Sequence, residues 1–95
     1  MPVRAVRYDS LQRTSTAADQ IQIVDSASCK QPYKVIGQVE WDGGLYSSGE
    51  SALIKLKPKA AEMGGDALLD LKNENRQSGQ SSWVLWSAKV IVFDK

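Results

Sequence analysis

The residues of this chain that could carry out acid–base, nucleophilic or metal chemistry are few and widely spaced. Cys29 is the only cysteine and there is no histidine, so an internal disulfide and a zinc site of several thiolates are both excluded. The commonest general base near neutral pH is also missing. Glu50, Glu62, Asp66 and Asp70 are too scattered along the chain to predict a carboxylate metal cage. We therefore predict no catalytic residue, no metal site and no cofactor, and we expect that the protein is not an enzyme.

Cys29 itself has two interpretations. It lies between Ser28 and Lys30 in a polar connection, where it is either a reactive thiol or an ordinary loop cysteine. Protease-like and disulfide-exchange chemistry both need a partner that this sequence lacks, so the loop cysteine is favoured.

A second candidate site lies at Gly43, Gly44, Ser47 and Ser48, just before the predicted helix. The free amide groups at the start of a helix attract anions, so these residues are candidates for ligand binding. The competing interpretation, a loop followed by a helix cap, is favoured because serine is a common capping residue.

Nucleic-acid binding is disfavoured by both charge and spacing. The formal net charge is only +1, so no overall field attracts a polyanion. Lys55, Lys57 and Lys59 spread around a helix instead of lining one side. Trp83 and Trp86 point to opposite faces of a strand and cannot form one stacking platform.

These candidates must be positioned by one helix and several strands. Serine capping signals and apolar residues at three- and four-residue steps predict a helix over residues 48–63. Pro58 lies opposite the apolar stripe, so we expect one kinked helix instead of two. Gly64 and Gly65 then favour a left-handed helix end and a tight reversal into the next strand.

Alternating apolar residues predict the strands. The clear ones cover residues 33–41, 66–71 and 83–93, and shorter ones are expected at 3–8 and 21–24. The polar segments 9–20, 26–32 and 73–82 are predicted to be loops. In the first clear strand, Gly37 indicates a bulge or the close approach of a helix.

The last strand is apolar on both faces. Its even positions from Val84 to Val92 are all apolar and must meet the core, whereas its odd positions are apolar at both ends with a polar middle. A single helix covers only one face of a sheet, and an exposed apolar face needs a cover. We expect that cover to be another copy of the protein, with an interface drawn from Trp83, Leu85, Ile91, Phe93, Ile36 and Leu68.

Three segments resemble a known group of small bacterial proteins. KAAEMGGDALLDL (59–71) resembles a segment of the YbjQ-like proteins that is also found in the stress-sensor lipoprotein RcsF. PYKVIGQVE (32–40) is similar to the strand that precedes it in related lipoproteins, and WSAKVIVF (86–93) is similar to their closing strand. The resemblance covers about residues 32–93 and concerns structural motifs only.

The resemblance implies a fold and an assembly. The fold is α+β, with one kinked helix on one face of a mixed, mainly antiparallel sheet of four to five strands, and the YbjQ-like family also implies a ring-shaped homo-oligomer. The RcsF-like branch depends on paired cysteines, whereas Cys29 has no partner here. Metal binding, a label carried by some members, does not suit a chain with one cysteine and no histidine.

These observations lead to a single α+β domain over residues 1–95, with N-terminal strands and a loop over 1–31 and the core over 32–95. Its expected role is non-enzymatic, through self-assembly or the binding of a partner protein or small ligand. The alternative is a soluble sensor or accessory domain of a bacterial envelope lipoprotein, and an enzyme is a weak third reading. No apolar run approaches the ~20 residues that span a bilayer. We expect a cytoplasmic protein if Met1 is the natural start, and an exported one with its signal removed otherwise.

Overall fold

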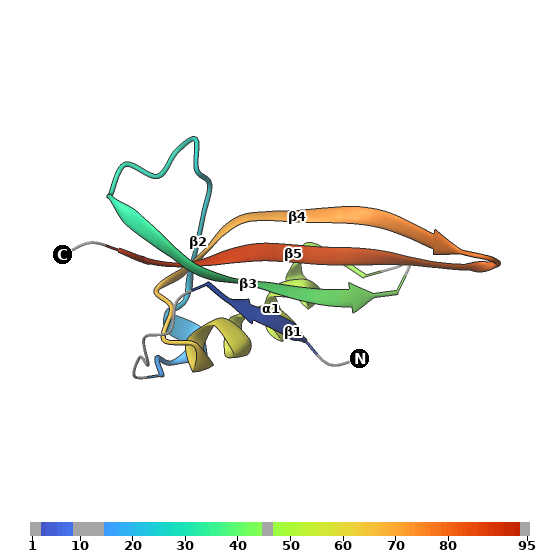
Figure 1. Cartoon of the computed structure of the whole chain (residues 1–95), viewed down its shortest axis with the longest axis horizontal. Helices are drawn as coiled ribbons and strands as arrows, with labels where there is room; N and C mark the ends of the chain where they lie inside the picture. The colour runs from blue at the N-terminus through green and yellow to red at the C-terminus, as the bar shows by residue number, and fades with distance from the viewer. Residues whose placement is uncertain (1–2, 9–14, 45–46, 94–95) are drawn as a thin grey trace.

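The computed structural model describes residues 3–8, 15–44 and 47–93, and it contains one α-helix packed on a five-stranded mixed sheet (Figure 1). This arrangement confirms the predicted α+β class. The sheet order is β1-β3-β5-β4-β2, with β2 parallel to β4 and the other neighbours antiparallel. In chain order the elements are β1 (Arg4–Arg7), the 3₁₀ turn η1 (Ala18–Gln20), β2 (Gln22–Val24), β3 (Tyr33–Gly43), α1 (Gly49–Glu62), β4 (Ala67–Ser78) and β5 (Ser81–Phe93). No helix among the described residues is long and apolar enough to cross a membrane.

Helix α1 runs from Gly49 to Glu62 as one helix with an exposed Pro58 inside it. It ends in the glycine motif expected from the sequence. Gly64 takes a positive φ of 80°, its N–H donates to Ala61 O, and the N–H of Gly65 donates to Ala60 O, both at 3.0 Å. This pair of hydrogen bonds satisfies carbonyl groups that a helix end otherwise leaves unpaired.

The main core lies between α1 and the face of the sheet that α1 covers. Its largest completely buried side chains include Leu56 of α1, Val39 of β3 and Val90 of β5. Burying a side chain of this size is worth roughly 1.5–3 kcal/mol. The even positions of β5 from Val84 to Val90 are buried in this layer, as predicted, and Val92 is partly buried against it.

Two bulges, one in β3 and one in β4, change the side-chain alternation of these strands. The register of β3 against β5 shifts between Val35 and Gly37, and that of β4 shifts between Leu69 and Lys72. Asp70 lies inside the second shift with a φ of 54°. Each bulge places one extra residue in its strand, so the residues on either side of it no longer follow a single two-residue repeat.

The expected interface positions Ile36 and Leu68 are wrong, because the structure places both on the helix side of the sheet. Both side chains are completely buried in the core on the helix side of the sheet. Ile36 lies within the β3 bulge. Leu68 pairs with Val90, and directly opposed residues share a face, so Leu68 faces the helix with Val90.

The predicted loop over 73–82 is also wrong, because these residues form the outer part of a long β-hairpin. β4 continues to Ser78 and β5 begins at Ser81, joined by a two-residue turn in which Gly79 has a φ of 60°. All side chains from Lys72 to Ser82 are exposed, so neither face of this hairpin carries the apolar alternation that marks a strand. The hairpin projects from the body of the domain, which measures 47 × 27 × 22 Å with the hairpin included (Figure 1).

Candidate binding surface

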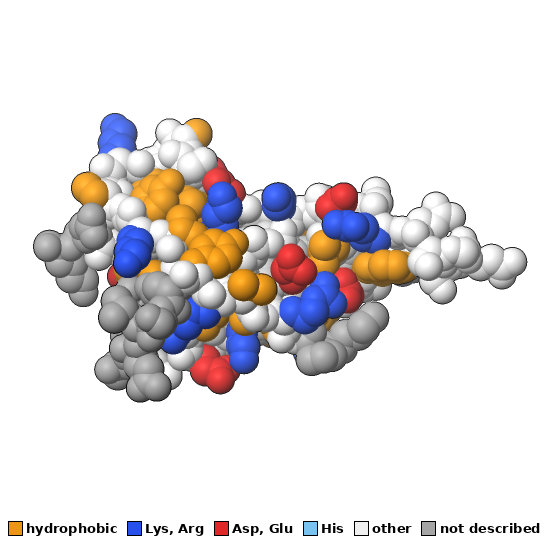
Figure 2. Space-filling view, viewed as in Figure 1, with side chains coloured by type: hydrophobic (Ala, Val, Ile, Leu, Met, Phe, Trp, Pro, Cys, Tyr) orange, Lys and Arg blue, Asp and Glu red, His pale blue; other side chains and the backbone are white. Residues whose placement is uncertain are grey.

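The face of the sheet that α1 does not cover, called the open face below, carries the best candidate site. On β5 this face presents the odd positions, of which Ser87 in the polar middle is buried. Trp83, Leu85 and Phe93 are partly exposed, Lys89 is exposed, and Ile91 is buried. Figure 2 shows this face with hydrophobic side chains gathered at the end opposite the projecting hairpin, charged side chains in the middle, and a smaller hydrophobic group among charges toward the hairpin.

The first of these hydrophobic groups packs mainly against other side chains of the same chain. Ile91, Ala67 and Leu69 are buried and pack with four partly buried neighbours, Val24, Tyr33, Val35 and Phe93. Ile91 is 0% exposed, so its expected place in an interface is wrong, because neighbouring side chains of the same chain already cover it. Phe93 keeps a partly exposed ring at the rim of this cluster.

The second hydrophobic group lines a groove, called the Trp83 groove below. It holds about 330 Å³ and is lined by Arg4, Glu40, Asp42, Arg76, Trp83 and Leu85. These residues come from β1, β3, β4 and β5, so four strands build one surface. Trp83 and Leu85 supply the apolar floor and the four charged side chains supply the walls.

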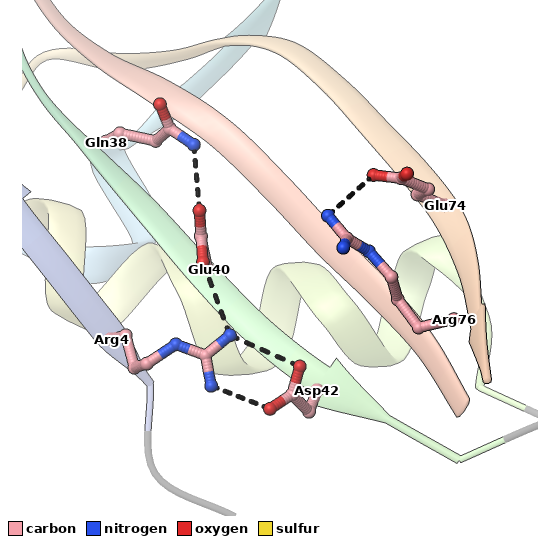
Figure 3. Close-up of polar contacts among 6 residues, drawn as sticks. All are labelled: Arg4, Gln38, Glu40, Asp42, Glu74 and Arg76. Atoms are coloured by element: carbon pink, nitrogen blue, oxygen red, sulfur yellow. Dashed lines mark hydrogen bonds and ion pairs between the residues drawn. The ribbon is translucent and has the colours of Figure 1, made fainter. Parts of the chain in front are cut away.

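A chain of hydrogen bonds holds one wall of the groove in place (Figure 3). Arg4 donates hydrogen bonds from its two terminal guanidinium nitrogens to the two carboxylate oxygens of Asp42, at 2.7 and 3.2 Å. Its Nη2 also donates to Glu40 at 3.3 Å. Gln38 donates to the other oxygen of Glu40 at 3.0 Å and accepts from the Tyr8 hydroxyl at 3.0 Å. A two-pronged arginine–carboxylate pair of this kind fixes direction as well as distance.

The contact between Arg4 and Asp42 shifts the pKa values of these two groups in the directions expected for an ion pair. The hydrogen bond from Arg4 holds the pKa of Asp42 below its usual range, against a smaller opposing effect of burial. Asp42 in turn raises the pKa of the Arg4 guanidinium above its ordinary value. Both groups therefore stay ionised at neutral pH.

The opposite wall is a second ion pair. Arg76 donates to Glu74 at 3.1 Å on β4, where Arg76 lies opposite Trp83 and Glu74 lies opposite Leu85. Each arginine of the groove thus has a carboxylate beside it. The surface carries charges of both signs around an aromatic floor instead of a field of one sign.

The second candidate site, before α1, has a structural explanation. Ser48 is the N-cap, accepting from the Ser51 N–H at 3.1 Å. The Ser47 hydroxyl accepts from Trp86 Nε1 at 2.8 Å and donates to Gly44 O at 2.7 Å. Both serine hydroxyls are engaged in folding the chain, Gly43 is buried and Gly44 is exposed. Anion binding at this place stays a prediction.

Cys29 is partly buried in the connection between β2 and β3, where its thiol donates to Gln31 O at 3.5 Å. In the described ranges, no three His, Cys, Asp or Glu side chains come close enough together to hold a metal ion. The interpretation of Cys29 as an ordinary loop cysteine stays a prediction.

Sequence reasoning identified Trp83 and Leu85 but missed the charged residues around them. Arg4 and Asp42 are 38 positions apart, and nothing local in the sequence brings them together. The only available signal was the polar alternation of Gln38 and Glu40 along one face of β3, which marks a face that is not buried.

Comparison with known proteins adds a likeness of fold. No family model matches the chain, and no curated protein matches its sequence. Among solved structures it is similar to the crystal structure of a Francisella virulence factor, FvfA, with a TM-score of 0.63 and 15% sequence identity over 93% of this chain and 95% of that one. At this identity the likeness shows that the two chains share a fold across nearly their whole lengths.

Proposed function

We propose that this protein is a non-enzymatic domain that binds another protein chain through the Trp83 groove. The observation that carries the proposal is the pairing of a partly exposed tryptophan and leucine with fixed charges of both signs on the open face. Tryptophan and arginine are among the residues most enriched at the positions that dominate protein–protein binding energy. Charged residues around an apolar centre set the register and the choice of partner.

The groove is already organised for binding. Arg4 is held by Asp42 and Glu40, so little side-chain entropy remains to be lost when a partner docks against it. The floor residue Leu85 has a strand neighbour on both sides, in β3 and β4, and Trp83 has one in β4. The contacts of Arg4 and the strand pairing of the floor therefore orient the groove before a partner docks.

The charge balance favours protein over nucleic acid as the occupant. A nucleic-acid surface gains its affinity from several cations that neutralise phosphates. Here Arg4 is compensated by Asp42 and Arg76 by Glu74. A small apolar ligand usually occupies a pocket that encloses most of its surface, whereas Arg4 and Arg76 in these walls are about half exposed.

The proposal is tested by placing a photo-crosslinking amino acid at Leu85 in the organism that encodes the protein. A matched control carries it at Ile54, which is 66% exposed on the outer side of α1. We expect a discrete crosslinked partner from position 85 and none from position 54. The identified partner is then purified, and Trp83→Ala is expected to weaken its Kd by about 30-fold, the equivalent of roughly 2 kcal/mol. An unchanged Kd for Trp83→Ala contradicts the proposal.

The non-enzymatic part of the proposal is supported by composition, since the chain has no histidine and one cysteine. Its test is separate from the partner search. Turnover of any substrate by the purified protein, abolished by Cys29→Ala, would assign a catalytic function instead.

A second candidate is an accessory domain of a bacterial envelope lipoprotein. Two observations favour it: the resemblance of residues 32–40, 59–71 and 86–93 to YbjQ-like and RcsF-like segments, and the shared fold with a protein described as a bacterial virulence factor. Membership of either of those two families is part of this candidate. Fractionation of cells that carry a tagged chromosomal copy tests it, because recovery in the envelope fraction supports the candidate and recovery in the cytosol contradicts it.

A further inference from the structure

The outer edge of β4 in the projecting hairpin has no neighbouring strand among the described residues. β2 pairs with β4 only at Ala67, Leu68 and Leu69, whereas β4 continues to Ser78. Segment Lys72–Ser78, called the free edge below, therefore bonds to β5 on one side only. Such an edge is a ready template for another strand.

The hairpin turn determines which backbone groups of the free edge point outward. The two-residue turn is closed by the pair Ser78 and Ser81, and the closing pair of such a turn exchanges backbone hydrogen bonds. Hydrogen-bonded and non-bonded pairs then alternate along the hairpin. The N–H and C=O groups of Asn73, Asn75 and Gln77 consequently face away from β5.

From this alternation we propose that two copies of the protein pair antiparallel through their free edges, with Asn75 of each copy opposite Asn75 of the other. In this register Asn73 lies opposite Gln77 of the second copy, and each outward pair exchanges two backbone hydrogen bonds. The result is a continuous sheet across both hairpins. Its two-fold symmetry, in which the same patch of each copy meets the other, is the commonest symmetry of homo-oligomers. The pairing shares the Glu74–Arg76 wall with the Trp83 groove but does not use the apolar floor, Trp83 and Leu85.

Charge selects this register over its neighbours. Glu74 lies opposite Arg76 of the second copy, and Arg76 opposite its Glu74, at non-hydrogen-bonded positions where opposed side chains come closest. A shift of the partner by two residues in one direction places Glu74 opposite Glu74 and Lys72 opposite Arg76. A shift in the other direction places Arg76 opposite Arg76. Each shift therefore opposes like charges, which destabilises a strand pair.

A third register, with Asn73 opposite Asn73, would pair opposite charges but is blocked by the chain itself. It requires Arg76 of the second copy to lie beside Asp70. That position is occupied by the segment that follows β2, where the Ser26 N–H donates to Asp70 Oδ1 at 2.7 Å. The free edge thus begins only after Asp70.

The test measures mass by sedimentation equilibrium from about 10 μM to about 1 mM, because a contact this small gives weak association. We expect a reversible monomer–dimer equilibrium. Arg76→Glu and Glu74→Arg each convert two attractive contacts into two repulsive ones and should raise the dimer Kd at least about tenfold. The double swap Glu74→Arg with Arg76→Glu restores opposite charges and should return the Kd to the wild-type value.

Amide hydrogen exchange locates the contact without any substitution. When the protein concentration is raised, the outward amides of Asn73, Asn75 and Gln77 should gain protection, while exchange at a core control position such as Val39 stays unchanged. A monomer at about 1 mM with no change at these three amides overturns the inference. A dimer whose Kd is unchanged by the charge substitutions also overturns the inference, because the copies then associate through another surface. A dimer that Trp83→Ala alone abolishes overturns it for the same reason.

Discussion

At the residue scale, the side chains that matter most are those that long-range contacts bring together. Arg4 enters from β1 and ties Glu40 and Asp42 of β3 into one network. Because Arg4 is about half exposed and Asp42 is largely covered, the pair is worth at most about 1 kcal/mol to stability. Its main effect is to fix the wall of the groove.

Asp42 makes a small part of the stability dependent on pH. Its folded pKa lies below the unfolded value of about 3.9, so its contribution is complete above about pH 4 and disappears as the pH falls through the lower, folded pKa. We expect Asp42→Asn to lower the free energy of unfolding by less than about 1 kcal/mol at about pH 7 and to have a smaller effect at about pH 3. Urea unfolding at both pH values measures this. Asp19→Asn, at an exposed site in η1, is the control, and a deficit for Asp42→Asn that is equal at both pH values contradicts the prediction.

At the element scale, local signals set the ends of α1 and one glycine sets its distance from the sheet. Ser48 begins the helix and Gly64 closes it. Gly37 of β3 lies where β1, β3 and the end of α1 meet. A Cβ placed there would come within 2.4 Å of Val6 O and 2.5 Å of Met63 Cε.

The N-cap offers a direct test of helix stability. Ser48→Ala removes the acceptor for the Ser51 N–H and should cost about 1 kcal/mol of unfolding free energy. Ser48→Asp keeps an acceptor at the same place and should recover most of the loss. Urea unfolding followed by circular dichroism provides the measurement, and equal stability of the alanine and aspartate variants would show that the cap is not formed.

Gly37→Ala should destabilise the fold by about 1–3 kcal/mol, because overpacking forces the β1 backbone or Met63 to move. Gly44→Ala is the matched control on the same segment, since a Cβ there meets nothing within 4 Å. Thermal unfolding of the two variants compares them. If Gly37→Ala unfolds at the wild-type temperature, α1 and β1 do not approach β3 this closely.

At the scale of the whole molecule, the domain has a packed body and a projecting hairpin with different physical properties. The body holds the two clusters of buried side chains. The outer hairpin is held by its own backbone ladder and buries no side chain from Lys72 to Ser82. Segments with few buried apolar contacts open with the lowest free energies.

Shortening the hairpin should therefore leave the body intact. Deleting Gln77, Ser78, Ser81 and Ser82 joins Arg76 and Trp83 through the same turn residues and preserves the hydrogen-bonding phase of the ladder. We expect the free energy of unfolding to change by no more than about 0.5 kcal/mol, as measured by urea unfolding. The same deletion removes Gln77, so the inferred dimer should be lost. A large drop in stability would show that the hairpin is part of the cooperative core.

The sequence by itself determined the fold class, the ends of the helix, the centres of the main strands and the two-faced character of β5, because capping residues and side-chain alternation act within a few neighbouring positions. Only the tertiary structure decided which face Ile36 and Leu68 occupy, since bulges reset the alternation and cross-strand partners fix it. The hairpin over 73–82 could not be predicted from the sequence, because a strand exposed on both faces has no apolar alternation. The Trp83 groove also required the tertiary structure, because the pairing of β1 with β3 brings together residues far apart in the chain, such as Arg4 and Asp42.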